Sequence, residues 1–385
     1  MAKRRTKKVK KIQKTIAFVL VILIFAFVLA CYFHPPLYAY ILGLFDLKDS
    51  KPEYRVDGDT TYIVNGEMPD LKMHFVDVGQ GDSIIIELPD GKNVIIDAGE
   101  ESEYDKLHDY IEENTSIERF DYAIATHADS DHIGAFDKIL ADYEVKMIYR
   151  PHVYYSGSKY NFSSSFNKGG KDAKKSTVNY GDFLKAVQDE TYLEDGSSKS
   201  ASWEFFTHES DFAGKISYQN EIYEYYFDFL TPRVESYSQI NFSNANDYSP
   251  IIKFTYEDVD VLLTGDAEGG DEGDGEDIFV EQYKALSGYE LDVDVLKVGH
   301  HGSRTSTTQA LLDLVKPEYA VIQCGLGNSY KHPHQESLDR LFELGCVLYR
   351  NDLHGNVVLV INSEGEFNFN VNIPNPNNVF VGGDA

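Results

Sequence analysis

Residues 121–132 read DYAIATHADSDH, and this stretch determines the fold class that we predict. Its first six residues are a short apolar run typical of a buried strand, and a helical pattern follows at 133–142. The loop between them holds four potential metal ligands: His127, Asp129, Asp131 and His132. Such a loop lies at the carboxyl edge of a sheet, where α/β proteins place ligands. These groups favour zinc, manganese or iron(II), although Asp131 could instead cap the following helix.

The pattern around this loop predicts an α/β layered fold, because mixed strands come first and strand–helix alternation follows. Strands are expected at 71–78, 83–88, 93–97, 121–126, 145–149, 225–230, 250–256, 259–264, 293–298 and 318–323, with a closing hairpin at 356–361 and 366–371. Helices are expected at 101–114, 133–142, 181–190, 277–287, 306–315 and 334–344. Residues 153–225, rich in Tyr, Ser, Gly and Lys, are expected to form loops and one helix over this scaffold.

Two further strand ends carry candidate ligands. Asp266 ends the segment Thr264-Gly265-Asp266, and its carboxylate could bridge two cations, although Gly-Asp alone is more typical of a turn. The segment KVGHHGS, residues 297–303, follows another apolar strand. Adjacent side chains on an extended segment point in opposite directions. We therefore expect either His300 or His301 to face the metal, and the other to face its surroundings or the substrate.

Other polar positions have two interpretations. The cluster Tyr330-Lys331-His332-Pro333-His334 predicts either a polar helix entry or a substrate-binding group. Asp77, Asp82 and Asp97 lie next to glycines at strand ends, which favours structural hydrogen bonds in turns over direct chemistry.

The N-terminal segment predicts a membrane anchor. Residues 1–14 are basic, and residues 15–33 are nineteen residues without a charge, enough to cross a bilayer as one helix. The basic flank favours a cytoplasmic tail at 1–14 and an extracellular body. A cleaved signal peptide or a lipoprotein signal around Cys31 are the alternatives, and both also place the body outside the cytoplasm. Residues 34–70 are expected to form a linker.

Charge and cysteine content exclude some classes of function. The 385 residues carry a formal net charge of −28, and the first fourteen hold eight of the 35 basic side chains and no acid. The rest of the chain therefore carries −36, which counts against non-specific binding of nucleic acid. Three cysteines cannot build a disulfide framework or a cysteine-type zinc site.

Taken in order, HADSDH, TGD, KVGHHGS and YKHPH resemble the metallo-β-lactamase superfamily. They are most similar to the branch found as the C-terminal domain of ComEC-type competence proteins, as are VDVGQGDS at 76–83 and IDAG at 96–99. The resemblance implies an αββα sandwich with metals at one edge. That domain would span 71–373, after the single N-terminal transmembrane helix and before a C-terminal tail at 374–385.

The resemblance also implies a ligand set for two divalent metal ions, Zn²⁺ or Mn²⁺. His127 and Asp129 would hold one metal, Asp131 and His132 the other, and Asp266 would bridge them. His300 or His301 would complete the second site. The superfamily's further histidine is absent, because Asn246-Asp247-Tyr248-Ser249 occupies its place, and His152 is a possible substitute.

The function implied is that of an extracytoplasmic metal-dependent hydrolase, a phosphodiesterase or nuclease that uses a metal-activated hydroxide. Asp131 or Asp266 would orient the hydroxide, and His301, Lys331, His332 or His334 would bind the leaving group or a phosphate oxygen. The substrate would be a phosphate ester or an envelope polymer, with DNA disfavoured by the acidic charge. The alternative is a non-catalytic envelope protein that uses residues 153–225 to bind a glycan or a protein.

Overall fold

The computed structural model describes residues 51–383 except 171–173, 235–241, 243, 271–273, 286–290 and 375. The basic tail expected at 1–14 and the membrane anchor expected at 15–33 lie outside the described residues. Within the described ranges, no helix combines the length and the apolar character needed to cross a bilayer.

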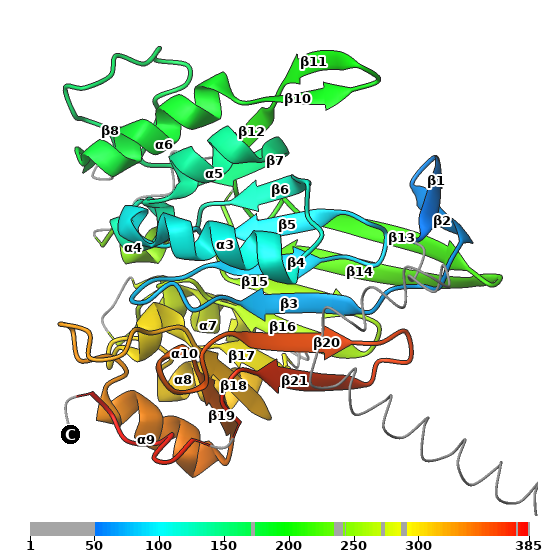
Figure 1. The fold of residues 1–385 in the computed structure, drawn as a ribbon. Helices are drawn as coiled ribbons and strands as arrows, with labels where there is room; N and C mark the ends of the chain where they lie inside the picture. Colours follow the sequence, from blue (N-terminus) through cyan, green and yellow to red (C-terminus); the bar gives the residue numbers. More distant parts are fainter. Residues whose placement is uncertain are drawn as a thin grey trace, which may run out of the picture. The chain divides into compact units, whose positions relative to one another are not determined.

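Two large β-sheets form the centre of the fold (Figure 1). The nine-stranded sheet contains, in spatial order, β1 (Glu53–Asp57), β2 (Thr60–Asn65), β13 (Phe212–Tyr218), β14 (Glu221–Phe229), β15 (Ile252–Tyr256), β16 (Val259–Leu263), β17 (Val295–Lys297), β18 (Tyr319–Ile322) and β19 (Val347–Arg350). The eight-stranded sheet contains β12 (Ser202–Phe205), β7 (Glu144–Arg150), β6 (Arg119–Ile124), β5 (Asn93–Ile96), β4 (Ile84–Glu87), β3 (Leu71–Phe75), β20 (Val357–Ile361) and β21 (Phe367–Val371).

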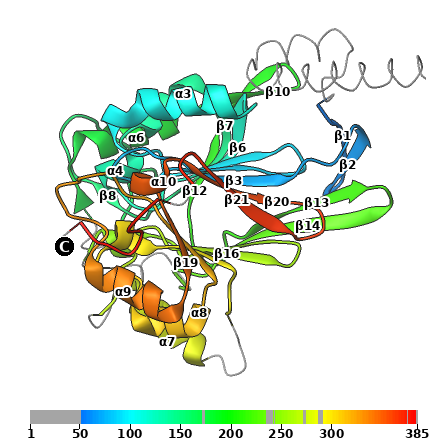
Figure 2. The ribbon, with the colours of Figure 1, turned by 60° about the horizontal axis from the view of Figure 1, so that its bottom comes forward.

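Helices cover the outer face of each sheet, as Figure 2 shows. The eight-stranded sheet packs against α3 (Tyr104–Asn114), α4 (Ser130–Ile133), α5 (Phe136–Asp142) and α6 (Val178–Asp189). The nine-stranded sheet packs against α7 (Gly275–Ala285), α8 (Gln309–Val315) and α9 (Gln335–Leu344). A short helix, α10 (Asn351–His354), follows β19. The α/β layered fold predicted from the sequence is confirmed.

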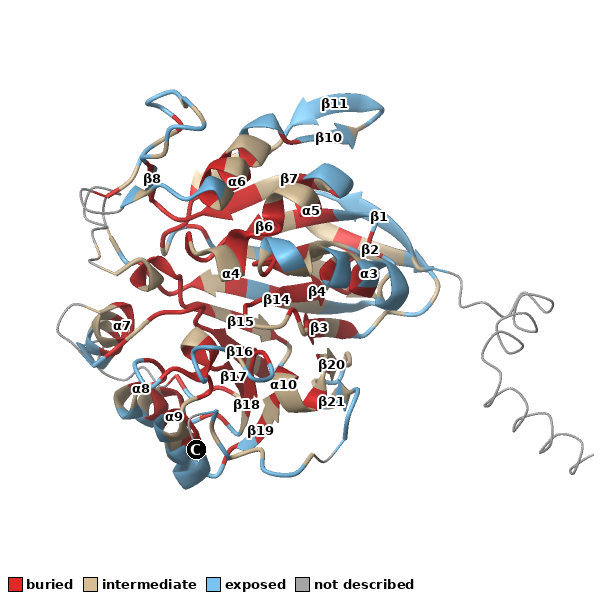
Figure 3. Cartoon of the chain, turned by 60° about the vertical axis from the view of Figure 1, so that its left-hand side comes forward, coloured by how far each residue is buried: buried red, intermediate tan, exposed pale blue. Residues whose placement is uncertain are grey.

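Side-chain alternation along the strands explains the layers. Ile84 and Ile86 of β4 pack between the sheets, whereas Ile85 packs under the helices. Val261 and Leu262 of β16 divide in the same way between the inter-sheet core and α7–α8. Since both faces of these strands are covered, they are apolar at nearly every position. Figure 3 shows the buried residues concentrated along the central strands.

The structure adds strands that the sequence pattern did not predict. The region 153–225 was expected to form loops and one helix. It contains α6, β12 and β13, and also a hairpin of β10 (Thr191–Glu194) and β11 (Ser197–Ser200) and the two short paired strands β8 (Tyr154–Tyr155) and β9 (Lys174–Lys175). The hairpin β10–β11 is polar and largely exposed, so it carries no apolar periodicity. Residues 34–70, expected as a linker, include β1 and β2.

Parallel strands bring the candidate ligands to one edge of the sandwich. β5 and β6 pair in parallel in one sheet, and β16 and β17 pair in parallel in the other. The loops after these four strands carry Asp97, the HADSDH motif, Asp266 and the HHGS motif. The carboxyl ends of parallel strands meet at one sheet edge, so these loops converge.

Candidate metal centre

Four buried side chains meet where these loops converge. One ligand atom each from Asp82, His132, Asp266 and His301 lies within 4.8 Å of every other. The Oδ2 atom of Asp266 is 3.1 Å from His132 Nε2 and 3.4 Å from His301 Nε2. The arrangement draws on both sheets, since Asp82 precedes β4, His132 follows β6, and the other two follow β16 and β17.

The polar atoms of this cluster fit a metal ion. Buried atoms without a hydrogen-bond partner include the Nε2 atoms of His127, His132 and His301, and the Oδ1 atoms of Asp82 and Asp266. Unpaired buried polar groups are costly, and a cation that accepts several of them as ligands removes that cost. Imidazole nitrogen together with carboxylate oxygen suits Zn²⁺ or Mn²⁺.

Hydrogen bonds on the far side of each ring orient the histidines. His132 Nδ1 is 2.7 Å from Asp97 Oδ2, and Asp97 also accepts hydrogen bonds from the backbone and hydroxyl of Thr126. His301 Nδ1 is 3.0 Å from the carbonyl oxygen of Gln323. A proton held on each Nδ1 leaves Nε2 as the atom that faces the cluster.

The remaining HADSDH residues divide into two groups. His127 Nε2 is 3.9 Å from Asp266 Oδ2, and Asp131 Oδ2 is 3.3 Å from His301 Nε2. The structure therefore brings His127 and Asp131 to the cluster. Asp129 instead pairs with the ammonium of Lys175 on β9.

The HHGS motif forms a tight left-handed turn, unlike the extended segment assumed from the sequence. His300 has φ and ψ of 47° and 47°, and His301 has 53° and 22°. Residues other than glycine rarely adopt this conformation, and such strain gathers at functional sites. His301 is buried in the cluster, while His300 lies at its border with Nδ1 2.8 Å from Glu268 Oε1 and Nε2 3.9 Å from Asp266 Oδ2.

The comparisons with known proteins agree with this geometry. The family model described as "Metallo-beta-lactamase superfamily" matches residues 76–207 and 247–325. This chain belongs to the metallo-β-lactamase superfamily. Members of this superfamily are generally metal-dependent hydrolases.

Two curated relatives match this chain over different lengths. ComE operon protein 3 of Bacillus subtilis (strain 168) is 26% identical over 302 residues, which are 74% of this chain and 32% of that protein. Competence protein ComA of Neisseria gonorrhoeae is 36% identical over 129 residues, or 34% and 17% of the two chains. The chain thus spans about a third of the first relative. Among solved structures, a mutant metallo-β-lactamase from Cronobacter sakazakii aligns with 15% identity and a TM-score of 0.33, covering 63% of this chain and 80% of that one.

Asp82 is the member of this metallo-β-lactamase centre that the sequence reasoning assigned to a structural turn. Its Oδ2 atom is 2.7 Å from the buried ammonium of Lys297, and its Oδ1 atom is 3.1 Å from His301 Nδ1. Gly81 makes this approach possible, because a Cβ atom there would lie 2.3 Å from the carbonyl oxygen of Asp131. The available signal was an acidic residue two positions before the three isoleucines of β4.

Opposite charges dominate the electrostatics of the cluster. Burial alone would lower the pKa of His301, but Asp266 and Asp82 outweigh it and raise that pKa to about 10. The pKa of His132 also rises despite burial, because Asp266 and Asp97 flank the ring. Burial and the neighbouring His132 instead lower the pKa of His127. The carboxylates thus favour positive charge on the rings of His132 and His301, and a bound cation would take the place of that charge.

The YKHPH motif lies beside the centre. The His332 ring is 5.3 Å from that of His300 and 6.1 Å from that of His301. Burial and the nearby His301 lower the pKa of His332 to about 3, so the ring is neutral, and its buried Nδ1 has no hydrogen-bond partner. His334 contacts the His332 ring rather than the cluster itself, and its Nδ1 accepts a hydrogen bond from the backbone N–H of Arg304.

His152, the possible substitute ligand, contacts the Phe205 ring at 4.7 Å and lines a cavity with Trp203 and Lys168. It is not a member of the four-residue cluster. Ser249, the last residue of the segment Asn246-Asp247-Tyr248-Ser249, places its hydroxyl 3.3 Å from His127 Nδ1. The Thr126 hydroxyl lies 3.1 Å from the same Nδ1 atom, so two hydroxyls hold the His127 ring from behind.

Proposed function

We propose that this chain is a metal-dependent hydrolase that cleaves a phosphodiester or related ester bond outside the cytoplasm. The observation that carries the proposal is the meeting of unpartnered, buried nitrogen and oxygen atoms from His127, His132, His301, Asp82 and Asp266. Divalent cations bound there would lower the pKa of an attacking water and offset the negative charge of the substrate.

Side chains and backbone groups around the centre would orient the metal ligands and the attacking water. Asp97 and the carbonyl of Gln323 fix the rings of His132 and His301. The Asp131 carboxylate is more open to solvent than that of Asp266, since its side chain is 24% exposed and that of Asp266 is 3% exposed. Burial opposes ionisation of Asp131, but hydrogen bonding to His301 outweighs it and holds its pKa below the usual range. Asp131 is thus an ionised acceptor placed to orient an attacking water.

The YKHPH motif is placed to bind the part of the substrate that leaves. His332 is neutral and offers one ring nitrogen as a donor or acceptor beside His300. Lys331 is exposed and supplies a positive charge for a phosphate oxygen. His334 borders the same turn through its ring contact with His332 at 4.7 Å.

We favour an envelope polymer as the substrate, with DNA as the competing class. DNA is retained because the Neisseria gonorrhoeae relative is called Competence protein ComA and the Haemophilus influenzae relative is called Recombination protein 2. The net charge of −36 after the first fourteen residues opposes approach of a long polyanion. We also propose that residues 15–33 anchor the chain, so that the catalytic body is extracellular. Protease protection in intact cells tests that topology.

One observation favours the alternative of a non-catalytic binding protein. Asp129 is paired with Lys175, and Ser249 stands near His127 where a further histidine would act as a ligand. If these departures prevented metal binding, the scaffold would remain folded without hydrolytic activity.

A panel of phosphodiesters tests the proposal with the full-length chain loaded with Zn²⁺ or Mn²⁺. It includes bis-p-nitrophenyl phosphate, a sugar phosphodiester and single-stranded DNA. We expect hydrolysis of at least one substrate by the wild type and a loss of about 100-fold or more in Asp131→Asn. Asp109→Asn, at an exposed helical carboxylate, is the matched control. A chain that binds metal and cleaves none of the substrates would refute the proposal.

A further inference from the structure

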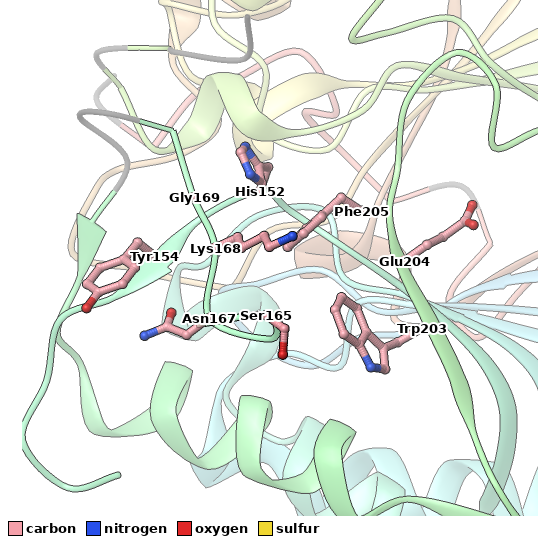
Figure 4. Close-up of a pocket in the computed structure, with 9 residues that line it drawn as sticks. All are labelled: His152, Tyr154, Ser165, Asn167, Lys168, Gly169, Trp203, Glu204 and Phe205. Carbon is pink, nitrogen blue, oxygen red and sulfur yellow. The ribbon is translucent and has the colours of Figure 1, made fainter. Parts of the chain in front are cut away.

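A cavity of about 640 Å³ lies between β12 and the loop at 165–169. Figure 4 shows Trp203 and Phe205 on one side of Lys168, and Tyr154 with Asn167 on the other. None of these residues has a role in the proposed hydrolysis. A cavity of this volume, lined by aromatic rings and a few polar groups, has the dimensions of a small-molecule or single-residue binding site.

A buried arginine holds the aromatic wall in place. The guanidinium carbon of Arg150 is 4.4 Å from the ring centroid of Trp203, 4.3 Å from that of Phe205 and 4.6 Å from that of Phe166. Arg150 is fully buried, and its Nε and Nη1 atoms have no hydrogen-bond partner. Burying a charge is costly, and cation–π contacts offset only part of that cost. The main consequence of this arrangement is a rigid aromatic surface.

The other side of the cavity, formed by the loop at 165–169, is held in place by hydrogen bonds and close packing. The Asn167 side chain accepts a hydrogen bond from the backbone N–H of Tyr155 at 2.8 Å and donates one to its carbonyl at 2.9 Å. Gly169 packs so closely that a Cβ atom there would lie 2.1 Å from the backbone nitrogen of Tyr154. A preformed site loses little conformational entropy on binding, which favours affinity.

Two short paired strands, β8 and β9, lie between the cavity and the metal centre. Tyr154 and Tyr155 of β8 pair with Lys174 and Lys175 of β9. Lys175 in turn pairs with Asp129 of the HADSDH motif. β8 and β9 therefore join the cavity wall to the HADSDH motif.

We propose that the cavity binds a sugar ring of a phosphodiester-linked polymer, next to the bond that is cleaved, an inference that rests on the proposed function. A sugar ring has an apolar C–H face that stacks on Trp203, and hydroxyls that match Glu204 and Ser165 at the cavity wall. Lys168 supplies a positive charge for the adjoining phosphate.

Two other ligand classes fit less well. A cationic headgroup would meet the ammonium of Lys168 and approach rings that already stack on Arg150. A strand of nucleic acid would meet Glu204 and the acidic body of the protein. The carbohydrate is therefore the class that the charges favour.

The test compares two substrates of the metal-loaded, full-length chain. One is an N-acetylhexosaminyl phosphoglycerol, and the other is the bis-glycerol phosphodiester that lacks the ring. We expect kcat/KM to be about tenfold or more higher for the sugar substrate, and Trp203→Leu to abolish this difference. Lys168→Gln changes an exposed side chain and should reduce the difference about threefold even if Trp203→Leu folds poorly. Tyr226→Leu, an exposed tyrosine on β14, is the control.

Calorimetry with the methyl glycoside of the same sugar separates the two proposals. Equal kcat/KM values for both substrates in the wild type would overturn the sugar site and leave the hydrolase intact. Metal-loaded protein that hydrolyses neither substrate but binds the glycoside, with binding lost in Trp203→Leu, would overturn the hydrolase and support the cavity. A single-stranded oligothymidylate that displaces the glycoside, and loses affinity in Trp203→Leu, would assign the cavity to nucleic acid instead.

Discussion

The two halves of the metal centre balance their charges in different ways. In the His132 half, His132 and His301 lie with Asp82 and Asp266 in one buried set. In the His127 half, His127 faces Asp266 from 3.9 Å, and the carboxylate of Asp129 is paired with Lys175. Both halves thus contain a lysine ammonium, but Lys297 pairs with one oxygen of Asp82 and leaves the other unpaired, whereas Lys175 pairs with Asp129, the carboxylate that the His127 half does not share.

This difference indicates which half binds metal more tightly. In the His132 half, the flanking carboxylates raise the pKa of both imidazoles, so the site favours positive charge that a divalent cation can supply. In the His127 half, a metal must compete with the ammonium of Lys175 for Asp129. We therefore expect one tightly bound metal and one weaker position, and the following changes test that ranking from the largest expected effect to the smallest.

Asp266→Asn should remove the distinction between the halves, because Asp266 is within 3.9 Å of ring nitrogens in both of them. We expect loss of bound metal and a decrease of about 10³-fold or more in kcat/KM. Metal analysis and phosphodiester kinetics measure these effects. Asp90→Asn, a buried carboxylate that bonds Lys92 and Tyr225, is the control. Retention of a tenth of the activity would contradict this role.

The sequence alone located most of this centre, because a motif at the end of an apolar strand has a defined place in a layered α/β fold. His127, His132 and Asp266 follow β6 and β16, and the parallel ends of these strands meet at the same edge. The layers followed from continuous apolar runs such as the isoleucines of β4.

The remaining features of the centre depend on contacts between residues far apart in the sequence, which a local sequence pattern cannot predict. Asp82 looks like a turn residue until the two sheets bring Lys297 and His301 against it. The choice between His300 and His301 was left open because an extended segment was assumed, whereas the motif folds as a left-handed turn. The pairing of Lys175 with Asp129 joins residues 46 positions apart, and lysine-rich segments are usually solvated.

Glu276 stabilises the HHGS turn, which carries His301 of the His132 half, through a short series of hydrogen bonds. Its carboxylate accepts hydrogen bonds from the backbone of Thr307 and Thr308, and the Thr307 hydroxyl accepts one from Gly299 at the start of the HHGS turn. Burial raises the pKa of Glu276 from 4.5 to about 7, and the hydrogen bonds to Thr308 and Thr307 lower it only in part.

Because this pKa is raised in the folded state, the folded protein binds more protons than the unfolded chain between pH 4.5 and 7. The contribution of Glu276 is complete below pH 4.5 and is lost as the pH rises through 7, by up to about 3 kcal/mol. Urea unfolding at several pH values should show this decline in the wild type and a flatter profile in Glu276→Gln. Glu281→Gln, an exposed position on α7, should keep the wild-type slope, and an unchanged slope in Glu276→Gln would disprove the assignment.

Asp97→Asn tests whether the hydrogen bond between Asp97 and His132 Nδ1 contributes to the higher metal affinity that we expect of the His132 half. The variant keeps the size of the side chain but removes the negative charge 2.7 Å from His132 Nδ1. We expect metal affinity to fall about 10- to 100-fold, since partners of metal-ligating histidines contribute at this level. Competition with a fluorescent chelator measures it, again with Asp90→Asn as control. Affinity within twofold of the wild type would show that the ring needs no such support.

Lys175→Met is the smallest change and addresses the other half directly. Methionine keeps most of the side-chain volume but leaves the carboxylate of Asp129 without its ammonium partner. A second metal would then find His127, Asp129 and Asp266 without a competing cation, so its affinity should rise about tenfold. Titration with Mn²⁺, followed by its electron paramagnetic resonance signal, resolves the two positions. Lys174→Met changes the neighbouring exposed lysine and should leave both affinities unchanged. If Lys175→Met binds the second metal no better than Lys174→Met, the Lys175 ammonium does not lower the metal affinity of the His127 half. The low affinity would then be due to the absence of a further histidine ligand.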